Sequence, residues 1–316
     1  MNSVQPDISI VVPVYNEEDV LIKFSEHLIH NLITLNISWE ILFIDDGSTD
    51  ETFSMIETLA VSDDRIFGLQ FSRNFGKEAA MMAGLEHANG RAVLIMDGDG
   101  QHPPEIIRSL VEPWHQGKAD IVRAVKQTRG SENIFSKTNA WVFNSIMEWA
   151  TGMDMTGASD FQLLDRRVVQ NILQMKEKNR FFRGLSSWTG FRAEKIPFHV
   201  DERIGGKSKW NNLRLLKLAV TGITSFSAKP LNLAVDMGIL GIAVSIILVI
   251  QALWSWLTGI AISGWTSLTI VILFFGSANL ITVGLVGIYL AKIYEEVKAR
   301  PLYLIQKKTR ISDIPG

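Results

Sequence analysis

Two aspartates one residue apart, Asp97 and Asp99, have the spacing in this chain that most directly indicates chemistry. They follow residues 92–96, a short apolar run that predicts a buried strand. Two carboxylates at one strand end repel each other, and their desolvation is costly unless a cation pairs with them. Carboxylate oxygens suit Mg²⁺ or Mn²⁺, and such an ion usually also holds substrate phosphates. The pair therefore predicts a metal site, and the alternative is a solvated Asp-Gly turn.

The elements that must position this pair form an alternating pattern. Apolar runs at 8–14, 39–44, 66–71, 92–96 and 121–124 predict strands, and helical spacing separates them. This alternation predicts an α/β fold with a mostly parallel sheet and helices on both faces. Ligands of such sheets bind at the carboxyl ends of the strands.

Polar residues follow each of the first four predicted strands. They are residues 15–17, 45–48 and 73–77, together with the aspartate pair. Because the carboxyl ends of parallel strands share one edge of a sheet, these residues are expected to converge on one site.

Composition and missing motifs exclude several classes of protein. The chain has no cysteine, so disulfides, thiolate metal sites and a cysteine nucleophile are excluded. Its 31 basic and 33 acidic residues give no bias toward nucleic acid. The N-terminus lacks the pattern of a signal peptide. Neither a Gly-x-Gly-x-x-Gly after the first strand nor a P-loop is found, which leaves carboxylates and a metal to hold a nucleotide.

Four ordered motifs carry a resemblance to a known family. Residues 11–17 (VVPVYNE), 45–48 (DDGS), 72–77 (SRNFGK) and 97–105 (DGDGQHPPE) resemble the motifs of family-two glycosyltransferases with the GT-A fold. Within that family the chain is similar to polyprenyl-phosphate glycosyltransferases, a group that includes bactoprenol glucosyltransferases and dolichol-phosphate mannose synthases. The similarity extends over nearly the whole chain.

The resemblance implies roles on the donor side. The nucleotide-sugar-binding residues would be Pro13, Tyr15, Glu17, Asp46, Arg73, Lys77 and Asp97. The ligands of Mg²⁺ or Mn²⁺ would be Asp97, Asp99 and Gln101, and Asp99 would also be catalytic. A capped strand end is the alternative for Pro13 and Tyr15, and a solvated helix start is the alternative for Arg73 and Lys77.

The resemblance also implies an acceptor side. The residues for the acceptor and its phosphate would be Arg123, Arg129, Lys137, Arg180, Arg183, Lys207, Ser208 and Lys209. Asp160 would be catalytic at the acceptor. Because the second pKa of a phosphate is about 6, Asp160 need only orient the acceptor or remove a residual proton. The alternatives are a capping role for Asp160, a solvated helix face for the basic residues near 126–149, and a membrane-facing basic surface for 203–229.

The C-terminal third predicts membrane attachment. Residues 237–291 contain no charged side chain, which is too long a run for one crossing of a ~30 Å hydrocarbon core. Two transmembrane helices are predicted near 232–257 and 267–293, after an amphipathic helix at 213–226. Basic residues flank the outer ends of the pair, so the catalytic domain and both termini are expected on the cytoplasmic side of the inner membrane. Small residues such as Gly276 and Gly284 predict close helix packing and a homo-oligomer.

These inferences divide the chain into four parts. They are a GT-A domain (1–210), a juxtamembrane amphipathic helix (211–230), two transmembrane helices (231–294) and a cytoplasmic tail (295–316). The expected activity is inverting transfer of one sugar, with UDP-glucose the favoured donor, to polyprenyl (undecaprenyl) phosphate.

Other activities stay open at this point. The donor could instead be GDP-mannose or a UDP-N-acetylhexosamine. A processive polysaccharide synthase is a further alternative, although two spans are few for a polymer channel and no Gln-x-x-Arg-Trp motif is found. The non-enzymatic alternative is a membrane scaffold that binds the lipid carrier.

Overall fold

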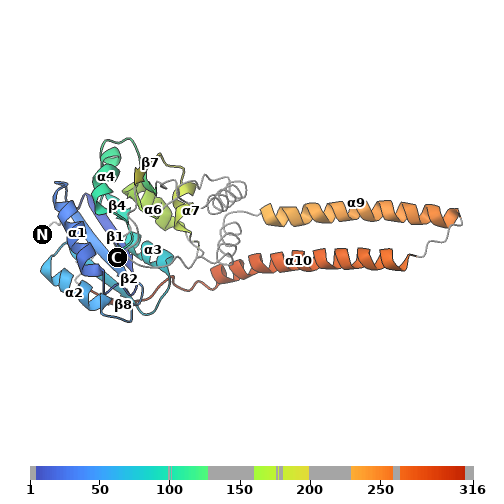
Figure 1. Cartoon of the computed structure of the whole chain (residues 1–316), viewed down its shortest axis with the longest axis horizontal. Helices are drawn as coiled ribbons and strands as arrows, with labels where there is room; N and C mark the ends of the chain where they lie inside the picture. Colours follow the sequence, from blue (N-terminus) through green and yellow to red (C-terminus); the bar gives the residue numbers. More distant parts are fainter. Residues whose placement is uncertain are drawn as a thin grey trace. The chain divides into compact units, whose positions relative to one another are not determined.

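The computed structural model describes residues 5–98, 100, 102–126, 160–175, 177, 181–198, 229–258 and 264–309. The chain forms two compact units (Figure 1). The first unit contains residues 1–211 together with 300–316, and the second contains residues 212–299. The predicted amphipathic helix at 213–226 lies outside the described residues.

The first unit is built on one sheet of eight described strands in the order β7-β5-β6-β4-β1-β2-β3-β8. The strands are β1 (Ile8–Val14), β2 (Trp39–Asp45), β3 (Ile66–Phe71), β4 (Ala92–Ile95), β5 (Ile121–Lys126), β6 (Gln162–Asp165), β7 (Ala193–Phe198) and β8 (Ile305–Lys308). Strands β1 to β4 pair in parallel with one another, as does β5 with β7. The predicted mostly parallel sheet is therefore confirmed, with antiparallel additions at β6 and β8.

Helices cover both faces of this sheet. They are α1 (Leu21–Ile33), α2 (Thr52–Ser62), α3 (Lys77–His87), the 3-10 turn η1 (Pro104–Ile106), α4 (Ile107–His115), α6 (Arg166–Gln174) and α7 (Phe182–Trp188). Apolar side chains of α1, α2 and α4 share one core cluster with alternate residues of β1, such as Ile10 and Val12. Helix α3 packs on the other face, where a Cβ at Gly84 would lie 2.1 Å from Val11 Cγ1.

The order of the parallel strands locates the ligand crevice. The chain passes from β1 to β2 and β3 and then returns to place β4 on the opposite side of β1. Open α/β sheets bind ligands outside the carboxyl ends of the strands where the order reverses. That position lies between the ends of β1 and β4, where Pro13 and Asp97 are found.

The second unit contains two long helices, α9 (Lys229–Leu257) and α10 (Trp265–Val297). By length and composition both could cross a membrane, and apolar side chains such as Ile246, Leu253 and Leu280 are exposed along them. The two helices contact each other at Gly241, where a Cβ would lie 2.6 Å from Phe275 Cε1. Close packing was also predicted at Gly276 and Gly284, but a Cβ added at either glycine would have no neighbour within 4 Å among the described residues.

Candidate active site

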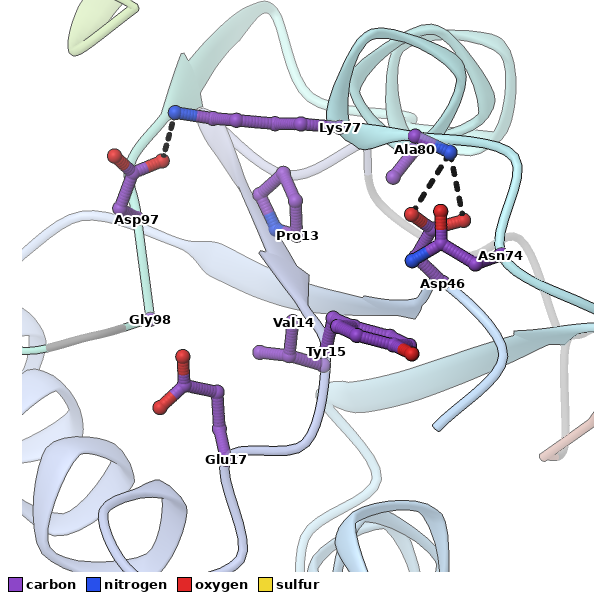
Figure 2. Close-up of a pocket in the computed structure, with 11 residues that line it drawn as sticks. Pro13, Val14, Tyr15, Glu17, Asp46, Asn74, Lys77, Ala80, Asp97 and Gly98 are labelled. Carbon is purple, nitrogen blue, oxygen red and sulfur yellow. Dashed lines mark hydrogen bonds and ion pairs between the residues drawn. The ribbon is translucent and has the colours of Figure 1, made fainter. Parts of the chain in front are cut away.

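A cavity of about 450 Å³ opens at the carboxyl ends of β1, β2 and β4 (Figure 2). It is lined by Pro13, Val14, Tyr15, Glu17, Asp46, Asn74, Gly76, Lys77, Ala80, Asp97 and Gly98. Six of the residues that sequence analysis predicted for nucleotide-sugar binding thus lie around one cavity. In Figure 2, Pro13 and Tyr15 lie between Asp97 on one side and Asp46 on the other.

Asp46 holds one wall of the cavity through backbone hydrogen bonds. Its Oδ1 accepts from the N–H of Phe75 at 2.6 Å, and its Oδ2 accepts from the N–H of Gly76 at 2.9 Å. Burial raises the pKa of this carboxyl, while the two N–H groups counteract that effect. Residues 73–76, the wall segment, are therefore fixed to the end of β2 by a carboxylate that is 4 % exposed.

The turns after β1 and β2 are bound to each other. Asn16, at φ 53°, accepts a 2.9 Å hydrogen bond from the N–H of Thr49, and its own N–H donates to Ser48 Oγ at 2.9 Å. Asp45 accepts from the N–H of Ser48 at 2.9 Å. This network fixes the backbone on which Tyr15 and Glu17 stand.

Four charged side chains, the ion cluster, lie at the other side of the cavity, and two of them, Lys77 and Asp97, line it. Lys77 Nζ lies 2.5 Å from Asp97 Oδ1 and 3.0 Å from Asp160 Oδ2. Arg183 binds both oxygens of Asp160, with Nε–Oδ1 at 2.8 Å and Nη2–Oδ2 at 2.9 Å. The cluster joins residues from α3, α7 and the segments that follow β4 and precede β6. Lys77 is thus an ion-pairing residue, not a solvated helix start.

The electrostatics of the ion cluster fix its charges. Burial would raise the pKa of Asp160, but hydrogen bonds and charge from Arg183 and Lys77 hold that pKa well below its usual range. Burial likewise opposes the charge of Lys77, whereas Asp160 and Asp97 raise its pKa above the ordinary value. Asp160 is therefore an ionised carboxylate with both oxygens occupied, which makes it a weak base.

Glu78, for which sequence analysis proposed no role, lies behind the ion cluster. Its Oε2 accepts a 2.9 Å hydrogen bond from the N–H of Phe182, at the start of the helix that carries Arg183. Burial raises its pKa to about 7, and the charge of Asp160 adds to that effect. The only signal in the sequence was its place beside Lys77, where a first-turn glutamate is ordinarily explained by the helix dipole.

His102 supports the backbone at the aspartate pair. Its Nδ1 accepts a 2.9 Å hydrogen bond from the N–H of Asp97, and its ring stacks on Phe161 at 4.4 Å between centroids. This histidine belongs to the quoted 97–105 motif, but the sequence did not indicate that its ring accepts a hydrogen bond from the backbone of Asp97.

The remaining predicted residues fall into two groups. Arg73 is described and lies over the ring of Phe75 at 4.0 Å, and Arg123 is buried in β5, 3.4 Å from Gln162 Oε1; neither lines the cavity. The others lie outside the described residues: Asp99, Gln101, Arg129, Lys137, Arg180, Lys207, Ser208 and Lys209. Asp165 caps α6 by accepting a hydrogen bond from the N–H of Arg167.

Asp97 supplies carboxylate oxygens, the ligand type that a hard divalent cation takes. Its carboxylate lines the cavity and already pairs with a cation, the Lys77 ammonium. Among the residues that the structure describes, no group of three or more His, Asp or Glu side chains is placed to hold a metal ion. Of the three predicted metal ligands, Asp97 alone belongs to the described part of the chain.

Comparisons with known proteins agree on one family. The model of glycosyl transferase family 2 matches residues 9–173. An uncharacterized glycosyltransferase, YkcC, of Bacillus subtilis (strain 168) is 38% identical over 307 residues, covering 96% of this chain and 95% of the relative. The bactoprenol glucosyl transferase of Shigella phage SfII is 40% identical over 308 residues, covering 96% and 98%.

A solved structure is also similar. It is glucosyl-3-phosphoglycerate synthase from Mycobacterium tuberculosis in complex with Mn²⁺, uridine-diphosphate-glucose and phosphoglyceric acid. The match has 19% identity and a TM-score of 0.46, and it covers 70% of this chain and 79% of that one.

Proposed function

The chain belongs to glycosyl transferase family 2 and is a glycosyltransferase with a GT-A-like α/β domain, and we propose that it transfers one sugar from a nucleotide donor to a polyprenyl phosphate. Bactoprenol glucosyl transferases that match over almost the whole chain support a lipid carrier as the acceptor. Their names also support glucose as the sugar, and UDP-glucose is the donor that we propose for it.

On the donor side, the cavity residues bind and orient the nucleotide. Pro13, Tyr15 and Glu17 after β1, together with Asp46 after β2, surround the base and ribose. Lys77 reaches into the same cavity and neutralises the diphosphate, since an ammonium group can exchange a carboxylate partner for a phosphate oxygen.

A divalent cation, Mg²⁺ or Mn²⁺, completes the site. Asp97, Asp99 and Gln101 would hold it at the end of β4, where His102 fixes the backbone N–H of Asp97. When bound, such an ion would neutralise negative charge on the leaving diphosphate.

On the acceptor side, Asp160 positions cations and does not take a proton. Its carboxylate is occupied by Arg183 and Lys77, so it aims two positive groups at incoming phosphate oxygens. A phosphate acceptor near pH 7 is largely ionised, because its second pKa is about 6, and it needs no strong base. Its oxygen attacks the sugar carbon on the face opposite the diphosphate, and the C–O bond to the diphosphate breaks.

The membrane end keeps the acceptor within reach. In this proposal α9 and α10 cross the inner membrane, and basic flanks such as Lys298 keep the catalytic domain and both termini on the cytoplasmic side. The lipid phosphate then stays at the interface while the enzyme acts on it. Assembly into a homo-oligomer through the small-residue face of α10 is part of the same proposal.

The observation that carries the proposal is the juxtaposition of the cavity with the ion cluster. Lys77 belongs to both, since it lines the cavity and also pairs with Asp97 and Asp160. One lysine therefore connects the predicted donor side with the predicted acceptor side. This arrangement suits a transfer in which the donor diphosphate and the acceptor phosphate, both anionic, must lie close together.

The test is a lipid-labelling assay with a donor panel. The purified full chain is incubated with polyprenyl phosphate, Mg²⁺ or Mn²⁺, and radiolabelled UDP-glucose, GDP-mannose or UDP-N-acetylglucosamine. We expect label in the organic phase, with UDP-glucose the best donor. Absence of lipid label with every donor and both metals would refute the proposal. Long water-soluble polymer would instead identify a polysaccharide synthase.

A further inference from the structure

The segment that follows the second long helix belongs to the catalytic unit. Strand β8 pairs antiparallel with β3, with Phe71 opposite Ile305 and Leu69 opposite Lys308. The N–H of Ser72 donates to the Leu304 carbonyl at 2.9 Å, directly before the wall segment. The C-terminal residues are thus an edge strand of the sheet beside the cavity, although α9 and α10 separate them from the rest of the unit in sequence.

Tyr303, just before β8, contacts both β3 and α3, the elements that precede and follow the wall segment in the sequence. Its ring stacks on Phe71 with centroids 4.8 Å apart and planes at 16°, and Phe71 meets the ring of Phe75 edge-to-face at 5.8 Å. Its hydroxyl hydrogen-bonds to the carboxylate of Glu86 on α3, the helix that begins with Lys77. Tyr303 therefore contacts the residue that packs under the wall segment and the helix that follows it.

The wall segment has little freedom to absorb a shift. Phe75 and Gly76 donate the backbone hydrogen bonds that Asp46 accepts. On the other side Gly47, at φ +73°, packs so closely that a Cβ there would lie 2.4 Å from the carbonyl carbon of Arg73. A displacement of the Phe75 ring would therefore reach the Asp46 hydrogen bonds and the cavity that they shape.

We propose that Tyr303 is a positioning residue for the donor site, so that the C-terminal segment shapes a pocket that it does not itself line. Aromatic stacking of Tyr303 on Phe71 holds Phe75, and Phe75 holds the backbone N–H groups at Asp46. The inference rests on the proposed function in so far as the cavity is the donor site. Its structural half, the control of residues 72–76 from Tyr303, does not depend on the ligand.

The test compares Tyr303→Ala with Tyr303→Phe in the full-length protein in lipid nanodiscs. Tyr303→Phe keeps the stacked ring and removes the hydroxyl that bonds to Glu86. Lys308→Ala is the matched control, since Lys308 is an exposed residue of β8, the strand that follows Tyr303. Four quantities are measured for each variant: amide hydrogen exchange of a peptide covering residues 72–80, the KM for the sugar nucleotide, the KM for polyprenyl phosphate, and kcat.

For Tyr303→Ala we expect exchange in residues 72–80 and the donor KM each to rise about 3- to 10-fold, the range that loss of one aromatic pair produces. The KM for polyprenyl phosphate and kcat should change by less than about twofold. Tyr303→Phe and Lys308→Ala should resemble the wild type in all four quantities.

Two results would overturn the inference. One is unchanged exchange of residues 72–80 in Tyr303→Ala. The other is an equal rise across β1 and β2, which would make Tyr303 a general contributor to stability and not a positioning residue. Failure of the wild type to label lipid with any donor would refute the proposed function separately, because the exchange experiment needs no nucleotide.

Discussion

The Asp46 wall of the cavity and the ion cluster, which reaches the cavity at Lys77 and Asp97, hold their carboxylates in different ways. Asp46 is fixed by backbone N–H groups at 2.6 and 2.9 Å, which move only if the chain moves. Asp97 and Asp160 are held by the side chains of Lys77 and Arg183. Each of these two cationic side chains is about two fifths exposed. Backbone partners give a rigid surface, whereas long cationic side chains can exchange one anion for another. The Asp46 wall is thus built for shape and the ion cluster for exchange with phosphate.

The largest expected effect is at Asp160, the carboxylate that holds both cations of the ion cluster. Asp160→Asn keeps the shape but removes the charge that holds Arg183 and Lys77, so kcat should fall about 100-fold or more. Donor affinity should change by less than about threefold, since the Asp46 wall is untouched. The measurements are kcat in the lipid-labelling assay and equilibrium binding of the sugar nucleotide.

The matched control for this change is Asp64→Asn, an exposed carboxylate between α2 and β3. If Asp160→Asn lost donor binding and kept its turnover per bound donor, Asp160 would belong to the nucleotide side. The division between the Asp46 wall and the ion cluster would then be wrong.

Lys77 should show the next largest effect, because it lines the cavity and also pairs with both carboxylates of the ion cluster. Lys77→Ala leaves Asp97 and Asp160 without their shared cation, and we expect kcat/KM for the donor to fall about 30-fold. Lys118→Ala, at an exposed lysine away from the cavity, is the control. A normal kcat/KM in Lys77→Ala would show that its ion pairs are incidental.

Asp46 tests the rigid wall. Asp46→Asn leaves one acceptor oxygen where two backbone N–H groups need partners, so the donor Kd should rise about tenfold while kcat at saturating donor is nearly kept. Titration of the nucleotide sugar and a saturating labelling assay separate the two quantities. A fall in kcat with unchanged donor Kd would assign Asp46 to the chemistry instead.

The smallest expected effect is the pH dependence of stability that Glu78, next to the ion cluster, contributes. Its pKa is raised from 4.5 to about 7, so between these values the folded protein keeps a proton that the unfolded chain releases. Stability from this group is therefore lost as the pH rises toward 7. Glu78→Gln removes the titration, and its melting temperature should gain on that of the wild type by about 2–4 °C between pH 5 and pH 8.

Melting curves of the full chain at four pH values would measure this trend, with Glu57→Gln on the exposed face of α2 as the control. A gain that is constant with pH, or that shrinks as pH rises, would show that Glu78 is ionised in the folded protein. It would then join the ion cluster as a third carboxylate.

Much of the donor side could be predicted from sequence because it depends on local order. Apolar runs defined β1 and β3 at the same residues as the structure, and parallel pairing brings Tyr15, Asp46 and Asp97 to one edge. Helical spacing in the sequence already begins at residue 17, whereas α1 begins at Leu21, because Asn16 and Glu17 form a turn whose N–H groups bind Ser48 and Thr52.

The contacts that sequence could not predict join distant segments through side chains. The pairing of Asp160 with Lys77 spans 83 positions, and nothing in the spacing of either motif specifies it. Strand β8 is a similar case, since residues 305–308 were expected only as part of a tail and pair with β3 more than 230 positions earlier. Glu78 and His102 act through backbone N–H groups, which a residue pattern does not reveal.

The most direct test of transfer onto a lipid phosphate is mass spectrometry of the product formed from matched acceptors. The wild-type chain receives the sugar nucleotide with either polyprenyl phosphate or the corresponding polyprenol, which lacks the phosphate that Lys77 and Arg183 are proposed to bind. We predict a product from polyprenyl phosphate that carries one added hexose and retains the phosphate, and none from polyprenol. Glycosylated polyprenol, or no lipid product from either acceptor, would contradict the proposed transfer.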